Sequence, residues 1–151
     1  MTTTFLEHVR SRLALHELRD GQGQPLLILH GLGERSPDAT PGAVQGWRGP
    51  IFALDFTGHG SSSVPVGGGY TCEALMSDAD AVLAELGPVT LLGYGLGGYV
   101  GLLLFGSRPT EINGLIIMDG PGLDGGGGRP TSPRLLHVPS SHLDGSTPDP
   151  W

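Results

Sequence analysis

Hydrophobic residues occur along this chain in short runs that are separated by polar, glycine-rich segments. Four of these runs, at residues 26–29, 51–55, 89–92 and 115–118, are nearly continuous rather than alternating. Such runs are typical of strands that are covered on both faces of a sheet. Hydrophobic and polar residues alternate more regularly in residues 12–18, and the glycine-containing segment 20–23 follows them. We therefore expect 12–18 to be a strand that enters a hairpin.

Two further segments show the pattern of helices. After Thr71, a residue type that caps helix N-termini, hydrophobic residues recur at helical spacing up to Leu86, and Gly87 and Pro88 then end the helix. Residues 99–105 are hydrophobic nearly all round, as in a buried helix. Strands that alternate with helices imply right-handed crossovers. The sequence thus predicts an α/β fold, with a mainly parallel sheet and helices on both faces.

The strand and helix patterns end near residue 122. Residues 123–151 are rich in glycine and proline and show no strand or helix period beyond 135–138. We therefore expect a folded core over residues 1–122 and a tail over residues 123–151.

The composition of the chain indicates which binding partners and which cellular location to expect. The formal net charge is −7, with 8 Lys and Arg against 15 Asp and Glu. Nucleic acid is thus an unexpected partner, because its binding requires clustered basic residues. No segment approaches the roughly 20 hydrophobic residues of a membrane-spanning helix, and the charged N-terminus lacks the hydrophobic run of a signal peptide. We expect a cytoplasmic protein that does not enter a membrane and needs neither a metal ion nor another cofactor.

Three glycine-rich turns directly follow expected strands. They are His30-Gly31-Leu32-Gly33, Asp55-Phe56-Thr57-Gly58-His59-Gly60 and Gly93-Tyr94-Gly95-Leu96-Gly97-Gly98. Ligands in open α/β sheets bind beyond the carboxyl ends of the strands, so a site is expected at these turns. Backbone N–H groups of the first turn are suited to stabilise an oxyanion. His59 is expected to be a structural hydrogen-bonding residue.

The order of these turns resembles that in the α/β-hydrolase fold family, over about residues 13–122. The resemblance implies that the third turn is a nucleophile elbow with Gly95 at the nucleophile position, and that Leu32 and Leu96 occupy oxyanion-hole positions. It also implies that the sheet is truncated after about the sixth family strand and that residues 123–151 begin a missing cap region. The other motif residues are expected to shape the turns: His30, Gly31, Asp55, Gly58, His59, Gly60, Gly93 and Gly97.

Gly95 departs from the family pattern, because glycine has no atom that can attack a carbonyl carbon. The later strands that bring an acid and a base histidine in the family have no counterpart here. Asp119 is a candidate acid without an identified partner, and His137 and His142 lie in the tail, where neither is expected to act as a base. We expect esterase- or lipase-like ancestry, absent or very low serine-hydrolase activity, and a small ester-like or hydrophobic molecule as the ligand.

Two alternatives remain open. The chain is a non-catalytic ligand-binding or interaction protein on this fold, or it is part of an NAD(P)-binding Rossmann oxidoreductase. Gly93-x-Gly95-x-x-Gly98 matches a dinucleotide fingerprint, with Asp119 placed to bind a ribose hydroxyl. Against this second alternative, at least three expected strands precede the fingerprint, which in most dinucleotide-binding domains follows the first strand.

The strand at 115–118 also bears on assembly. If it is the last strand of the sheet, its outer edge is hydrophobic and unpaired, and such an edge is a template for pairing with another chain. We therefore expect a homodimer formed through this exposed sheet edge.

Overall fold

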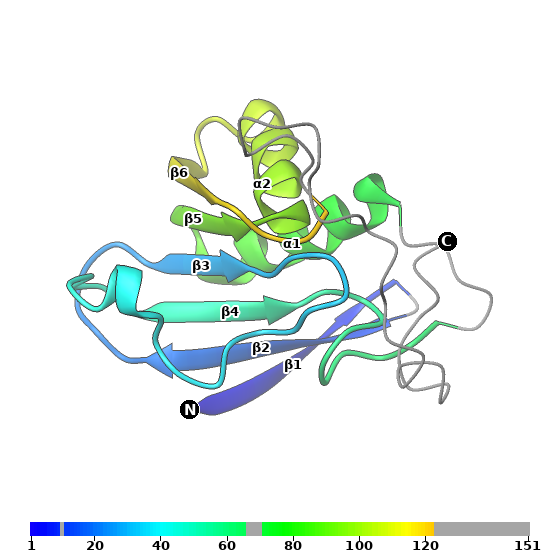
Figure 1. The fold of residues 1–151 in the computed structure, drawn as a ribbon, viewed down its shortest axis with the longest axis horizontal. Helices are drawn as coiled ribbons and strands as arrows, with labels where there is room; N and C mark the ends of the chain where they lie inside the picture. Colours follow the sequence, from blue (N-terminus) through cyan, green and yellow to red (C-terminus); the bar gives the residue numbers. More distant parts are fainter. Residues whose placement is uncertain (10, 66–70, 123–151) are drawn as a thin grey trace.

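The computed structural model of the protein describes residues 1–9, 11–65 and 71–122. Its described residues form one six-stranded sheet with the strand order β1-β2-β4-β3-β5-β6 (Figure 1). Strands β3, β4, β5 and β6 run parallel, whereas β1 and β2 are antiparallel to their neighbours. The expected α/β fold with a mainly parallel sheet is confirmed. The strands are β1 (Thr2–His8), β2 (Ser11–Arg19), β3 (Leu26–Leu29), β4 (Ile51–Asp55), β5 (Val89–Tyr94) and β6 (Ile112–Met118).

The N-terminal strands differ from the sequence-based expectation. Strand β1 was not expected, and β2 pairs with β1 and β4 rather than forming a hairpin with β3. The hairpin prediction is wrong because β4 and β5 pair with both edges of β3, which leaves no edge of β3 for β2. All four residues of β3 are buried, and the parallel partners β4 and β5 flank this strand at the centre of the sheet.

Two helices follow β4 and β5. Helix α1 spans Cys72–Leu86, and the Thr71 side chain accepts a hydrogen bond from the Ala74 N–H at its start. The helix ends at Gly87, whose φ of 71° favours glycine. Helix α2 spans Leu96–Ser107 and so begins earlier than residue 99, because the chain passes from Gly95 directly into the helix.

The two faces of the sheet are covered differently. Buried residues of both helices, such as Leu83 and Leu104, share one hydrophobic cluster with Leu27 and Leu91 of the sheet. The second cluster contains Val44, from the short 3-10 helix η1 (Gly42–Val44), and Trp47 packs against it. In the described residues, therefore, both α-helices pack on one face, and the second face is covered by the η1 segment, whereas the sequence predicted helices on both faces.

The sheet brings the turns of the expected site together at the carboxyl ends of its parallel strands. Because β3, β4, β5 and β6 are parallel, the turns that leave their carboxyl ends meet on the same side of the sheet (Figure 1). The tail at 123–151, including His137 and His142, lies outside the described residues. The division into a core and a tail therefore stays a prediction.

Candidate functional site

The turns after β3, β5 and β6 meet at one backbone carbonyl group. The Leu32 N–H and the Leu96 N–H both donate to the Pro121 carbonyl oxygen, at 3.0 and 2.8 Å. The Gly95 N–H also ties the third turn to β6, by donating to Met118 O at 3.0 Å. The two N–H groups that the resemblance singled out thus converge on a single oxygen atom. Sequence reasoning did not anticipate this contact, because no signal in Gly120-Pro121-Gly122 indicates which groups its carbonyls meet.

Gly95 lies directly beneath this segment. Its backbone has φ 50° and ψ −118°, a conformation that residues with a Cβ atom rarely adopt. A Cβ atom built on Gly95 lies 2.5 Å from the Gly120 carbonyl carbon and closer still to the Pro121 oxygen. Gly120 and Pro121 therefore fill the space in which a side chain at position 95 would project.

The other glycines of this turn allow the strand and the helix to pack closely. A Cβ on Gly93 overlaps the backbone of Gly98, and a Cβ on Gly97 lies 2.6 Å from the His30 carbonyl oxygen. These contacts explain the fingerprint-like spacing Gly93-x-Gly95-x-x-Gly98 without a bound dinucleotide.

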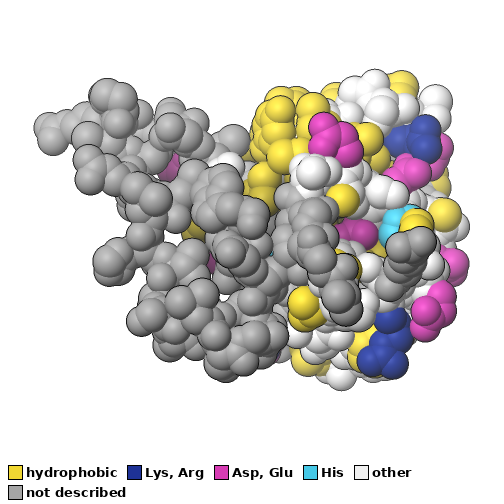
Figure 2. Space-filling model, turned by 90° about the vertical axis from the view of Figure 1, so that its right-hand side faces the viewer, with side chains coloured by type: hydrophobic (Ala, Val, Ile, Leu, Met, Phe, Trp, Pro, Cys, Tyr) yellow, Lys and Arg dark blue, Asp and Glu magenta, His cyan; other side chains and the backbone are white. Residues whose placement is uncertain are grey.

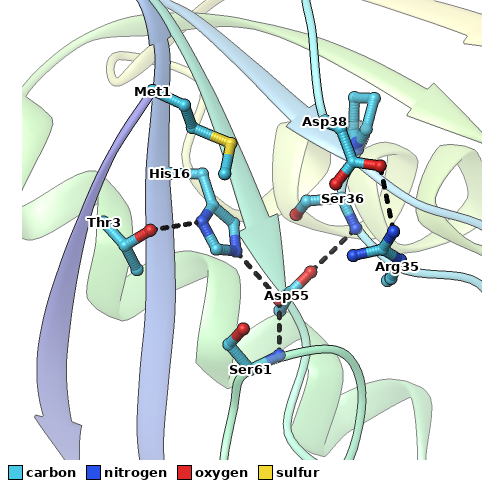
Figure 3. Close-up of a pocket in the computed structure, with 9 residues that line it drawn as sticks. Met1, Thr3, His16, Arg35, Ser36, Asp38, Asp55 and Ser61 are labelled. Atoms are coloured by element: carbon cyan, nitrogen blue, oxygen red, sulfur yellow. Dashed lines mark hydrogen bonds and ion pairs between the residues drawn. The ribbon is translucent and has the colours of Figure 1, made fainter.

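The Asp55 carboxylate holds the second turn. It accepts hydrogen bonds from the Ser36 N–H and the Ser61 N–H, both at 2.7 Å, and it lies 2.9 Å from His16 Nε2 (Figure 3). Burial alone raises the pKa of Asp55, but the hydrogen bonds from Ser61, His16 and Ser36 together lower it below its ordinary value. His16 and Ser36 were missed in the sequence. A histidine within the hydrophobic β2 segment was the available signal.

The glycines of this turn fit closely around its backbone. The Gly58 N–H donates to Ser63 O at 2.9 Å, and the φ angles of Gly58 and Gly60 are both positive. A Cβ on Gly60 would lie 2.6 Å from Asp55 Oδ1. His59, also in this turn, lies with its Nδ1 3.1 Å from Thr57 O, and burial lowers its pKa.

His30 joins the first and second turns. Its Nε2 accepts from the Phe56 N–H at 3.1 Å, so its Nδ1 carries the proton that it donates to Gly31 O at 2.8 Å. Burial, as the largest cause, lowers the pKa of His30 to about 4. At neutral pH this imidazole is uncharged, with both nitrogens engaged by backbone groups.

Four other sequence expectations can be compared with the described residues. Asp119 is exposed just after β6, and no ion pair of its side chain is recorded among the described residues. Gly31 is confined, because a Cβ there would lie 2.8 Å from Glu34 Oε2 and 3.0 Å from Pro121 O. In the described parts of the chain, no three His, Cys, Asp or Glu side chains are grouped as metal ligands. None of the described helices has the length and hydrophobicity to span a bilayer.

Gly95→Ser is expected to destabilise the fold. The variant places a side chain in a strained backbone conformation, which costs about 1–3 kcal/mol, and it pushes against the Gly120–Pro121 backbone. Gly106→Ser is the matched control, since a Cβ on Gly106 meets nothing within 4 Å. Urea unfolding of both variants measures the effect. A free energy of unfolding for Gly95→Ser at or above that of the natural chain contradicts this prediction.

His30 predicts a loss of stability in acid. Its pKa in the folded chain, about 4, lies below the ordinary 6.5, so between these pH values the unfolded chain binds the additional proton. Stability is therefore lost as pH falls from 6.5 towards 4, by on the order of 3 kcal/mol. Denaturant titrations across this range measure the loss. His30→Gln should reduce it, leaving the part due to His59, and an unchanged pH dependence would count against the assignment.

Comparisons with known proteins agree with this architecture. Residues 24–139 match the model of the alpha/beta hydrolase fold family. The chain is 33% identical over 135 residues to lipase LipV of Mycobacterium tuberculosis, covering 86% of this chain and 51% of that protein. It is 31% identical over 118 residues to 2-hydroxymuconate semialdehyde hydrolase of Pseudomonas putida, covering 74% and 41%.

One similar solved structure carries a glycine in place of a serine. It is a serine-to-glycine mutant of the N-acyl homoserine lactonase AidH complexed with N-hexanoyl homoserine lactone. It is 25% identical, with a TM-score of 0.64, and the match covers 78% of this chain and 45% of that one. The chain spans about half the length of the curated relatives named above. By its sheet, its turns and the family match, the chain belongs to the α/β-hydrolase fold family.

Proposed function

We propose that this chain, of esterase- or lipase-like ancestry, binds a carbonyl or carboxylate oxygen of a small ester-like ligand at the Leu32 and Leu96 N–H groups. Its serine-hydrolase activity at position 95 is absent or very low. The observation that carries this proposal is the convergence of the two N–H groups on the Pro121 oxygen. In the proposed complex, the ligand oxygen replaces that carbonyl.

The geometry supports binding of a polarised oxygen. Two backbone donors within about 3 Å of one acceptor form the arrangement that stabilises an oxyanion during acyl transfer. The Leu32 and Leu96 side chains are half-buried beside the same position and offer a hydrophobic wall for an acyl chain. A nucleophile is lacking at Gly95, so binding at this site does not lead to a covalent acyl intermediate there.

Relatives support the ligand class. One relative is named a lipase, and the lactonase mutant with glycine in place of serine was obtained in complex with an acyl homoserine lactone. Retention of an ester-like ligand by a glycine-containing member of the fold is the behaviour proposed here. Asp119 as an acid without a base partner, and a cytoplasmic location, remain predictions.

The same site also serves the first alternative, a non-catalytic binding protein. We do not favour the dinucleotide alternative, because the glycines of its fingerprint are explained by the close packing of Gly93 against Gly98 and of Gly95 against Gly120 and Pro121. In addition, β5 is the fifth strand along the chain rather than the first.

Titration of ¹⁵N-labelled protein with butyrate tests the proposed site. The carboxylate should displace the Pro121 carbonyl, so the amide resonances of Leu32 and Leu96 should shift together and saturate, with a dissociation constant of about 1 mM or weaker. The amides of Trp47 and Leu75, which donate to Val44 and Thr71, are the internal controls. Shifts that are absent at Leu32 and Leu96, or equal at all four amides, would refute the proposal.

We further propose that two copies of the chain associate through β6. This strand lies at the sheet edge in the described residues, and its Ile116 and Ile117 are 40% and 43% exposed. Tyr99, Leu102 and Phe105 of α2 are also exposed. Hydrophobic side chains gather at the upper edge of Figure 2, the level at which α2 and β6 lie in Figure 1.

Light scattering over a range of concentrations checks this association. The natural chain should form a dimer as concentration rises, and Ile117→Lys should shift the equilibrium to the monomer because a charged edge disfavours pairing. Val9→Lys, at a 91% exposed position in the β1–β2 turn, is the control. A natural chain that stays monomeric at high concentration contradicts the proposal.

A further inference from the structure

A hydroxyl, an imidazole and a carboxylate lie in line on the face of the sheet opposite α1 and α2. Thr3 of β1 is paired in register with His16 of β2, and Thr3 Oγ1 lies 2.8 Å from His16 Nδ1. On the other side of the ring, His16 Nε2 lies 2.9 Å from Asp55 Oδ2 (Figure 3). His16 and Asp55 are both buried.

The hydrogen-bond partners fix the direction of proton donation along this row. Asp55 also accepts from two backbone N–H groups, those of Ser36 and Ser61, as an ionised carboxylate does. His16 Nε2 therefore carries a proton and donates it to Asp55. In the neutral imidazole, the lone pair of His16 Nδ1 is then left to accept from the Thr3 hydroxyl. This is the order of donors in which an imidazole activates a nucleophilic hydroxyl.

The row opens into a small cavity. The cavity has a volume of about 110 Å³ and is lined by Thr3, His16 and Asp55 together with Ser36. Arg35, paired with Asp38 at 2.9 Å, also lines it and is largely exposed to solvent. A water molecule needs about 10–15 Å³ of such space, so the cavity holds several waters and has room for an acyl group of acetyl size.

The Ser36 hydroxyl also lines the cavity. Ser36 is only 6% exposed, and its Oγ forms no well-oriented hydrogen bond among the described residues, although it lies close enough to the Asp55 carboxylate to help lower the pKa of that group. Buried hydroxyl groups nearly always have a well-oriented partner. A hydroxyl placed in this way is suited to donate to an oxygen of a molecule bound in the cavity.

We propose that Thr3, His16 and Asp55 form a second acyl-transfer site, separate from the Gly95 turn, that accepts small acyl esters. Thr3 Oγ1 is the nucleophile and His16 is the general base. Asp55 is a positioning residue that holds the imidazole, and Ser36 Oγ donates to the developing oxyanion. The site supplies the hydroxyl nucleophile that position 95 lacks, from a different strand of the sheet.

The reaction follows the acyl-ester route. Thr3 Oγ1 attacks the ester carbonyl carbon while its proton passes to His16 Nδ1. The bond to the leaving oxygen then breaks, and His16 returns the proton to the departing alcohol, which leaves an acyl ester on Thr3. Water next gives a proton to His16 and attacks the same carbon. As the carboxylic acid is released, His16 returns the proton to Thr3 Oγ1.

Acylation by p-nitrophenyl acetate provides the test. The chain contains no lysine, so few amines compete for the acetyl group. Trypsin cleavage after Arg10 yields the peptide 1–10, which contains Thr2, Thr3 and Thr4. We expect a burst of p-nitrophenolate and an acetyl ester located on Thr3 by tandem mass spectrometry. Hydroxylamine should remove this ester, whereas an acetyl group on the N-terminal amine resists hydroxylamine.

Matched variants separate this chemistry from surface acylation. Thr3→Val keeps the side-chain shape and should abolish the burst and the adduct. Thr4→Val should retain both, because alternate residues of a strand point to opposite faces and Thr4 is exposed. His16→Gln should slow acylation by about 100-fold, the usual contribution of a general base. Thermal melts show whether each variant is folded. If His16→Gln does not fold, the comparison of Thr3→Val with Thr4→Val still tests the proposal.

An adduct that persists in Thr3→Val, that forms equally on Thr2 or Thr4, or that does not form at all would overturn the proposal. The Gly95 site is tested separately, because the butyrate-induced shifts of Leu32 and Leu96 should be the same in Thr3→Val. Loss of acylation with retained shifts, or the reverse, identifies which of the two proposals fails.

Discussion

The Pro121 carbonyl oxygen is the point on which the strand-end architecture depends. By accepting from Leu32 and Leu96 it joins the turns after β3, β5 and β6, three strands that are adjacent in the sheet but distant in sequence. A carbonyl oxygen between two converging N–H groups has the chemical character of a bound ester or acid oxygen. The chain thus occupies its own proposed ligand position, and the absence of a side chain at Gly95 leaves room for this occupation.

The Asp55 carboxylate is a second group that holds together segments distant in sequence. It fixes the backbone at Ser36 and Ser61 and also orients His16. One buried group therefore supports the turn after β4 and the cavity beside β1 and β2. A buried carboxylate of this kind stabilises the fold only while its donors remain in place. The two proposed sites accordingly share a scaffold but use different atoms.

The sequence was most informative where a local pattern determines the structure. Continuous hydrophobic runs predicted β3 to β6, the cap at Thr71 and the glycine at Gly87 predicted α1, and the three turns predicted where a site lies. The pairing partners of the strands were harder to predict. Strand β2 pairs with β4 because β4 and β5 occupy both edges of β3. Contacts made by backbone atoms, such as the Pro121 carbonyl, have no side-chain signature. His16 was visible as a polar residue in a hydrophobic strand, but its partners come from β1 and β4, which no local pattern specifies.

Amide hydrogen exchange at Leu32 and Leu96 tests the central claim most directly, in the full chain and in a variant that ends at Asp119. The account predicts slow exchange of both amides in the full chain and much faster exchange of both in the variant, which lacks Pro121. Protection at Gly98 and Trp47, whose N–H groups donate to Gly95 and Val44, should persist in both proteins. Rapid exchange of Leu32 and Leu96 in the full chain, or unchanged protection after removal of Pro121, would contradict the account.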